Sequence, residues 1–520
     1  MINRLKSFCS IENISFALLC AAAVFSKSTS INDGALVPKQ LYTLFAAGIM
    51  IVILSFKSIL GYKIKIEAKA WICIIAVVAG FEAAYSLFQY FVYLYFDLDV
   101  SVGGHFDNPA GLIATLCVSL PFALFFYSST DKYRKFALIL CILIILAVVV
   151  SRSRTGMIIS VMLLLNVFLK EKKVTLRLRS LLLVGLIVIL IIGAYFINQD
   201  SADGRILIWK ACWPLICDTP FYGNGIGTFS RLYMDYQAIF LDGCPVDGKY
   251  HMLAGNVLVP FNEYIRLYLN FGVIGLFALI SIATIMWIAY IKHPNAEKRV
   301  WLQAVAVIAF ISLFSYPFTY PFTYIVCAIA ILFVCKNGVA IRVAKTAKMM
   351  GAISAIIVGI YLSIYSFRQI RNEYLWFEAY AERSIAKYAL LFDDYNNSPH
   401  FLYSYAMELY NSNDLDYSLE IAKKCDNMIA HYDLELLLGD IYYQLKQYDK
   451  SQKHFTIALR MCPNRFIPLE SLHAIYAIQG DNDRATKIAK KIISKPEKVS
   501  SRSVKRIKAR MKRYLENDAD

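Results

Sequence analysis

Long apolar runs, separated by short charged segments, most strongly limit how this chain can fold. A helix needs about 20 residues to cross a bilayer. With 58% hydrophobic and only 18% charged residues, the chain is too apolar for a soluble protein. The runs cover residues 11–25, 41–56, 71–96, 109–127, 136–150, 155–169, 181–197, 264–291, 300–316, 321–335 and 349–367. We therefore predict an all-α, polytopic membrane helix bundle of about 11 spans.

The chain changes character after residue 367, where charges are dense and no run is long enough to span. We predict a membrane domain over residues 1–367 and a separate helical domain over 368–520. In the segment 432–463, the packing and turn positions of a 34-residue tetratricopeptide unit are filled by Leu438, Gly439, Tyr442, Phe455, Ala458 and Pro463. This pattern predicts a C-terminal α-solenoid, which either binds peptide on its concave face or serves as a structural cap.

Lysine and arginine gather in alternate loops, which predicts the orientation of the chain. With a cytoplasmic N-terminus, the basic inside loops are 57–69, 131–135, 170–179, 292–299 and 336–348. A long loop over residues 198–261 and the C-terminal domain then lie outside, on the periplasmic side of a bacterial inner membrane. The net charge of +16 thus reflects orientation and does not indicate nucleic acid. The basic tail 487–513 is either a solvated helix or a contact for membrane lipids.

The long loop leads into an apolar helix that carries one polar stripe. Asn262, Glu263, Arg266 and Asn270 fall at i, i+1, i+4 and i+8, on one side of a helix. Because polar groups are unfavourable against lipid, we expect this stripe to face a cavity.

Three further arginines stand at predicted outside positions. Arg152 and Arg154, in VVVSRSRTGM, either hold a diphosphate with their planar donors or extend to the membrane interface. Arg205 begins a helix with Trp209 and Trp213 at i+4 and i+8, which predicts an interfacial anchor or a substrate clamp.

Other polar segments outside the membrane have local structural interpretations. In VGGHFDNPAG, Asp107 and Asn108 either cap the helix that starts at Pro109 or bind sugar hydroxyls. The segment GNGIGTF lacks the strand and the Lys-Ser/Thr ending of a phosphate loop, which predicts a flexible turn. Three cysteines share the long loop and allow one disulfide, and no metal-ligand spacing is present.

Four segments together resemble the O-antigen ligase and polymerase superfamily, which includes bacterial O-oligosaccharyltransferases. They are FDNPAG, SRSRTG, GR…W…TPFYGNGIGTF and FNEYIRLYLNFGVIG, in this order over residues 103–276. A trailing tetratricopeptide domain resembles the oligosaccharyltransferase-type members. The resemblance implies glycan transfer from undecaprenyl diphosphate at the periplasmic face, without a metal or another cofactor.

The resemblance also implies roles for the polar residues. Arginines stabilise the departing diphosphate, for which the candidates are Arg152, Arg154, Arg205 and Arg266. Asp107, Asn108, Asn262 and Asn270 are candidates for positioning the glycan or the acceptor. Many members have a histidine directly before the residue that matches Asn262, and this chain has Phe261 there. The base is then Glu263, which we prefer, or His251, or no strong base is used and positioning and charge stabilisation carry the rate.

The preferred function is transfer of a lipid-linked oligosaccharide onto a hydroxyl of a protein or of lipid A core. The alternatives are a polysaccharide polymerase, whose acceptor is another lipid-linked glycan, and a non-enzymatic membrane scaffold whose solenoid recruits partners.

Overall fold

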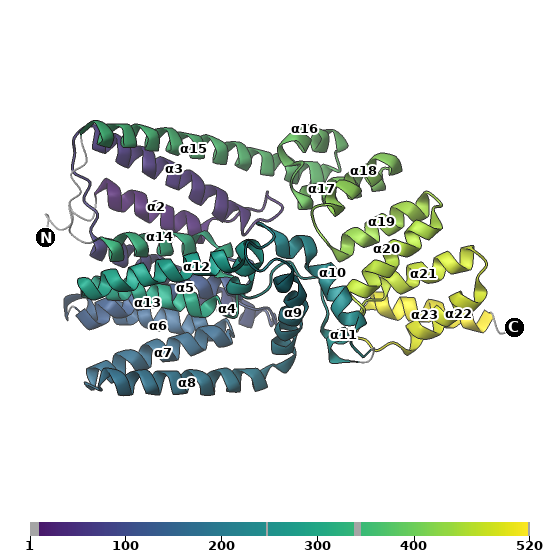
Figure 1. The fold of residues 1–520 in the computed structure, drawn as a ribbon, viewed down its shortest axis with the longest axis horizontal. Coiled ribbons are helices and arrows are strands. Elements are labelled where there is room, and N and C mark those ends of the chain that lie inside the picture. The colour runs from purple at the N-terminus through teal and green to yellow at the C-terminus, as the bar shows by residue number, and fades with distance from the viewer. Residues whose placement is uncertain (1–9, 130, 246–247, 337–344, 518–520) are drawn as a thin grey trace. The chain divides into compact units, whose positions relative to one another are not determined.

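The computed structural model describes residues 10–129, 131–245, 248–336 and 345–517, which form helices and turns without a strand (Figure 1). The fold is therefore all-α, as the sequence predicts. Most of the predicted loop 336–348 lies outside the described residues.

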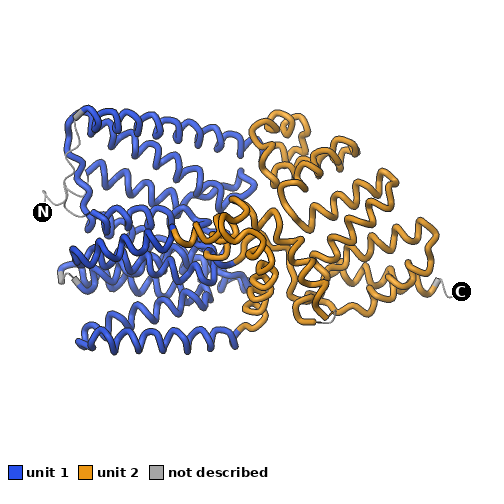
Figure 2. Tube along the Cα trace, in the orientation of Figure 1, with its two compact units in different colours: residues 1–197, 261–263, 278–377 blue, residues 198–260, 264–277, 378–520 orange. Residues whose placement is uncertain are grey.

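The chain divides into two compact units, each built from separate chain segments (Figure 2). Unit 1 comprises residues 1–197, 261–263 and 278–377, and unit 2 comprises residues 198–260, 264–277 and 378–520. Most of the long loop thus belongs to the same unit as the C-terminal helices. The helix Lys345–Glu382 runs through residue 367 without interruption.

Every apolar run predicted as a span corresponds to a helix. These helices are α2 (Ile11–Phe25), α3 (Val37–Ile59), α4 (Ala68–Tyr95), α5 (Pro109–Ser129), α6 (Arg134–Val150), α7 (Arg154–Glu171), α8 (Leu176–Ile197), α12 (Glu263–Lys292), α13 (Ala296–Ile311), α14 (Pro321–Cys335) and α15 (Lys345–Glu382). Within the described part of the chain, six of them, α3, α4, α5, α8, α12 and α15, are long and apolar enough to cross a membrane. The helices α2 and α14 are apolar but shorter. A multi-pass membrane protein is indicated, and the total of 11 spans remains a prediction.

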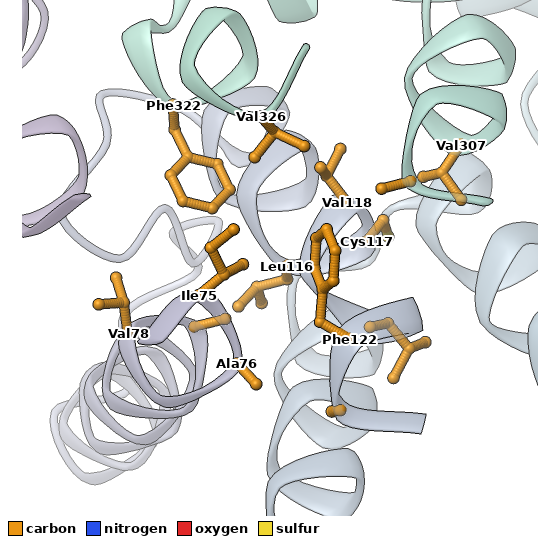
Figure 3. Close-up of a cluster of buried hydrophobic side chains, with 14 of the residues drawn as sticks. Ile75, Ala76, Val78, Leu116, Cys117, Val118, Phe122, Val307, Phe322 and Val326 are labelled. Carbon is orange, nitrogen blue, oxygen red and sulfur yellow. The ribbon is translucent and has the colours of Figure 1, made fainter. Parts of the chain in front are cut away.

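The core of unit 1 forms around α5, where side chains of α4, α13 and α14 interlock with those of α5 (Figure 3). Buried members include Ile75, Leu116, Phe122, Val307 and Phe322. Lipid tails are as apolar as leucine, so membrane helices associate mainly through close packing. Gly80 of α4 shows this, because a Cβ there would lie 2.4 Å from Cδ2 of Leu140 on α6.

Unit 2 contains the loop helices, the first turns of α12 and a series of helix pairs. The loop helices are α9 (Gln199–Asp218), α10 (Thr228–Asp242) and α11 (Lys249–Leu253). The C-terminal helices are α16 (Ile385–Tyr395), α17 (Pro399–Asn411), α18 (Leu415–Asp426), α19 (Tyr432–Gln444), α20 (Tyr448–Met461), α21 (Ile467–Ile478), α22 (Asn482–Ser494) and α23 (Arg502–Asn517).

One hydrogen bond recurs between successive helix pairs. The Ser418 hydroxyl donates to the Ala406 carbonyl at 2.8 Å, and the Ser451 hydroxyl donates to the Gly439 carbonyl at 2.7 Å. Donors and acceptors are each 33 residues apart. This repetition supports a helical repeat, while its assignment to the tetratricopeptide type remains a prediction.

The basic C-terminal helix α23 closes this series of helix pairs. Ile507 and Met511 are buried in a cluster with Phe466 and Leu469 of the preceding helices. The apolar face of α23 is therefore covered by protein. Contact of its charged face with membrane lipids remains a prediction.

The loop helix α10 packs against the repeat helix α20. Gln237 of α10 is fully buried, and its Nε2 donates to the carbonyl of Met461 at 2.7 Å. The Arg460 guanidinium donates from Nε to Asp242 at 3.0 Å. Asn464 donates from Nδ2 to the carbonyl of Ala254, at 2.6 Å. These contacts hold the long loop against the C-terminal helices.

Candidate functional site

The FDNPAG segment forms a tight turn at the start of α5. Asn108 Oδ1 accepts a hydrogen bond from the N–H of Ala110 at 2.8 Å, which confirms Asn108 as a cap. The Tyr320 hydroxyl lies 3.2 Å from Asn108 Oδ1 and 3.4 Å from Asp107 Oδ1. Gly111 makes room for this tyrosine, because a Cβ on Gly111 would lie 2.7 Å from its Cε1. Sugar binding by the two polar residues remains a prediction.

The SRSRTG segment turns the chain from α6 into α7, with Ser153 as the side-chain cap of α7. Arg152 has a φ of 55° and forms an exposed ion pair with Asp99 at 3.3 Å. Arg154 is half-buried, and its Nη1 donates to the carbonyl of Ala194 at 2.6 Å, in the last turn of α8. The two arginines therefore have different surroundings, although they are only two positions apart.

Glu263 and Asn262 fasten the beginning of α12 to the segment after α13. Glu263 is buried, its N–H donates to Ser312 O at 2.8 Å, and its Oε1 accepts from the N–H of Phe318 at 3.0 Å. The Asn262 side chain donates to the Leu313 carbonyl at 3.1 Å. Because α12 begins at Glu263, Asn262 lies before the helix and not on the helical stripe that the sequence predicts.

A series of aromatic rings connects the beginning of α12 to the FDNPAG turn. Phe261 has a φ of 51°, and its ring meets Tyr316 edge-on with centroids 5.4 Å apart. Tyr316 stacks on Tyr320 at 6.3 Å, and Tyr320 reaches the turn as described above. Residues far apart in sequence thus form one polar and aromatic cluster in unit 1.

Three residues beside the same turn are absent from the sequence-based candidates. Lys39 and Glu82 are fully buried, and His105 lies between them. Lys39 Nζ donates to the carbonyls of Ser26 at 2.6 Å and His105 at 2.8 Å. Glu82 Oε1 accepts from the N–H of His105 at 2.9 Å, and Oε2 lies 2.7 Å from its Nδ1. The sequence contains a signal for this site, because Glu82 is the one charged residue in the apolar run 71–96. Charged residues within membrane helices are commonly functional.

In unit 2, the loop helices pack around a small core that includes Leu207 and Leu241. Arg205 and His251 are half-buried on α9 and α11. Helix α9 begins at Gln199, so Arg205 lies within the helix and does not begin it as the sequence predicts.

The glycine-rich turn after α9 docks on a break in α12. Gly272 has a φ of 60° and a ψ of −153°, which interrupts the helix. The N–H of Val273 donates to Pro220 O at 2.9 Å, and the N–H of Asn224 donates to Leu269 O at 2.8 Å. A Cβ on Gly272 would lie 2.3 Å from a backbone oxygen of the turn. The segment predicted as a flexible turn is therefore fixed by backbone hydrogen bonds.

Arg266 and Asn270 are half-buried on the part of α12 that precedes this break. Both lie in unit 2, with the glycine-rich turn.

Comparison with known proteins identifies a family for the middle part of the chain. Residues 136–280 match the O-antigen ligase family. This match supports an O-antigen ligase domain in the chain. The matched residues include the SRSRTG turn, the long loop and the first turns of α12. A search of curated proteins gives no match.

The candidate residues fall into two sets. Unit 1 brings Asp107, Asn108, Asn262 and Glu263 into the cluster around Tyr320, and it also contains Arg152 and Arg154. Unit 2 contains Arg205, His251, Arg266 and Asn270. The Phe261 position, where many superfamily members have histidine, lies in unit 1 among aromatic rings.

The described residues contain no cluster of three or more His, Cys, Asp or Glu side chains that could hold a metal ion. The loop cysteines Cys212, Cys217 and Cys244, for which the sequence allows one disulfide, are free thiols in the structure.

Proposed function

We propose that this membrane glycosyltransferase of the O-antigen ligase and polymerase type moves an oligosaccharide from undecaprenyl diphosphate onto an acceptor hydroxyl. The reaction takes place at the periplasmic face of the bacterial inner membrane. The observation that carries the proposal is the family match over residues 136–280, within which the glycine-rich turn is fixed to the segment of α12 that bears Arg266. This docking supports a defined surface around Arg266, as a substrate site requires.

Arginines suit the proposed chemistry because negative charge grows on the diphosphate as its bond to the sugar breaks. A guanidinium keeps its charge and offers paired donors to phosphate oxygens. We assign the main stabilising roles to Arg266 and Arg154, with Arg152 and Arg205 as further diphosphate contacts. Arg266 also lies in the first turns of a helix, where the helix dipole favours anions.

The preferred acceptor is a hydroxyl of a protein or of lipid A core. A second candidate function is polysaccharide polymerisation, in which the acceptor is another lipid-linked glycan. One observation favours this second candidate: α10 and residue 254 occupy part of the repeat surface. Since the repeats hold the chain's own loop, they have a role that requires no acceptor peptide.

Deletion of the gene, followed by glycan-specific blots of periplasmic glycoproteins and surface polysaccharide, tests the proposal. Loss of the glycoprotein signal indicates a protein oligosaccharyltransferase, and polysaccharide that is no longer attached to lipid A core indicates a ligase. Shortened polysaccharide with normal glycoproteins indicates a polymerase. No change in any of these contradicts the enzyme and supports the scaffold.

Complementation with Arg266→Ala gives a sharper test. We expect this variant to reach the membrane at the wild-type level and to restore no glycan transfer, while Arg266→Lys restores part of it, because lysine keeps the charge but lacks the paired donors. Arg299→Ala is the matched control, since Arg299 is an exposed arginine in the predicted cytoplasmic loop 292–299. Full transfer by Arg266→Ala would show that this arginine has no role in the reaction.

A further inference from the structure

A buried carboxylate and an imidazole form a close pair within unit 1. Glu82 lies in the apolar helix α4 with 0% of its surface exposed. Burial of an ionisable group in such a helix is unfavourable unless the group has partners. Both Glu82 oxygens face His105, one at its backbone N–H and the other at its ring nitrogen. The chain also makes room for this contact, because Gly104 has a φ of 65° and a Cβ there would lie 2.1 Å from Glu82 Oε1.

The pair has the geometry that prepares an imidazole to accept a proton. The distance from Glu82 Oε2 to His105 Nδ1 is 2.7 Å. A carboxylate only accepts hydrogen bonds, so Nδ1 carries the hydrogen and Nε2 presents its lone pair. The described residues engage Nε2 in no hydrogen bond, and the His105 side chain is partly exposed. Tyr85 stacks on the ring with centroids 3.9 Å apart, which fixes its plane.

The pair also belongs to the cluster that contains other candidate residues. His105 is two positions before Asp107, which contacts Tyr320, and Tyr320 leads through Tyr316 to Phe261. By comparison, Glu263 already accepts a backbone hydrogen bond from Phe318 within unit 1.

We propose that His105 Nε2 takes the proton of the acceptor hydroxyl during glycan transfer, and that Glu82 is the positioning residue that sets the tautomer and orientation of the ring. The inference rests on the proposed function. In the step, the acceptor oxygen forms a bond to the anomeric carbon and the carbon–oxygen bond to the diphosphate breaks. The electron pair of that bond leaves with the diphosphate, and the hydroxyl proton passes to Nε2, which releases it to water. Glu82 stabilises the imidazolium that forms.

The variant His105→Asn separates this role from a structural one. An asparagine amide can replace Nδ1 as the donor to Glu82 but has no atom equivalent to the Nε2 lone pair. We use full-length protein mixed with membranes of the deletion strain, which supply the lipid-linked glycan and the unmodified acceptor. The readout is release of undecaprenyl diphosphate from about pH 5.5 to about pH 9, a range that spans imidazole titration. The charged or titratable groups that contact or flank His105 are Glu82 and Tyr85 of α4, Lys39 of α3 and Asp107.

We expect His105→Asn to lower the rate by about 10²–10⁴-fold and to remove the acidic limb of the pH profile. Glu82→Gln should lower the rate and move that limb to lower pH, because the imidazolium loses its anionic partner. His105→Ala should regain activity when imidazole is added. A purely structural role predicts loss of rate without these changes in the pH profile and without rescue, and that result would overturn the proposal. So would a normal rate and profile in His105→Asn.

The release assay distinguishes an error in the proposed function from an error in the role of the Glu82–His105 pair. If wild-type protein releases no undecaprenyl diphosphate, the proposed function is wrong and the inference falls with it. If wild-type protein is active and the three variants behave like it, only the role of the pair is wrong.

Discussion

Replacement of Gln237 with leucine tests whether the C-terminal helices hold the long loop in place. Gln237 is fully buried and makes three hydrogen bonds with oxygen atoms, besides a long contact of its Nε2 with the Met234 sulfur at 4.0 Å. The Tyr233 hydroxyl donates to its Oε1 at 2.7 Å, and its Nε2 donates to Gly255 O at 3.1 Å and Met461 O at 2.7 Å. Met461 is the last residue of α20, so its carbonyl has no acceptor role within that helix. Leucine fills a similar volume and removes all three bonds.

The expected effect follows from the groups that lose their partner. Each buried polar group left unpaired destabilises a fold by about 1–3 kcal/mol. Two carbonyls and one hydroxyl are affected, and rearrangement with entry of water brings the total toward the lower end, about 3 kcal/mol. Such a loss raises the population of the locally open state about 100-fold, since about 1.4 kcal/mol corresponds to a factor of ten.

Hydrogen exchange of the full-length protein in lipid nanodiscs measures this opening. We expect peptides from α10 and the end of α20 to exchange about 100-fold faster in Gln237→Leu, with α5 unchanged. Gln479→Leu is the matched control, because Gln479 is exposed in the same unit. Unchanged protection of α10 in Gln237→Leu would refute the view that these bonds hold the loop.

Two further predictions concern unit 2. Gly272→Ala should detach the glycine-rich turn, because the new Cβ would lie 2.3 Å from the backbone of that turn. We expect faster hydrogen exchange of residues 219–225 and glycan transfer that is lower by about tenfold or more. The control Gly351→Ala, whose new Cβ would lie in open space, should change neither. Burial lowers the pKa of His473, so the unfolded chain binds its proton more readily and stability should fall as pH drops below about 6.5. In His473→Leu, the difference between the hydrogen-exchange rates of α21–α23 at about pH 5.5 and at about pH 7.5 should shrink. The control His400→Leu, at an exposed residue, should keep this difference. An equal difference in both variants would contradict the view that His473 causes the loss of stability at low pH.

The helices could be predicted from the sequence because the signal is local. Apolar runs of sufficient length mark the membrane helices, and Asn108 before Pro109 marks the start of α5. The recurrence of packing residues likewise indicated the C-terminal helix pairs. In each case, the residues that determine the structure are neighbours in the chain.

Features that depend on distant partners could not be predicted in this way. The break at Gly272 is stabilised by residues about Pro220, and no local pattern connects the two segments. Glu82 is the one charged residue of its apolar run, but its partner His105 lies 23 residues later and no local pattern connects the two. The apolar run that follows the polar stripe predicts a continuous helix, and the interruption at Gly272 is imposed by tertiary contacts.

Unit 2 is assembled from chain segments that are far apart in the sequence, which affects the order in which the protein can fold during synthesis. Gln237 and its partner Met461 are 224 residues apart. At a synthesis rate of about 5–20 residues per second, the loop therefore waits about 10–45 s before the helix that holds it has been made. During that interval α20 is not yet present to cover the face of α10 that it buries in the folded protein, so only local packing can hold the loop. A ribosome that stalls before α20 leaves a membrane bundle complete in its spans but with its loop unsecured.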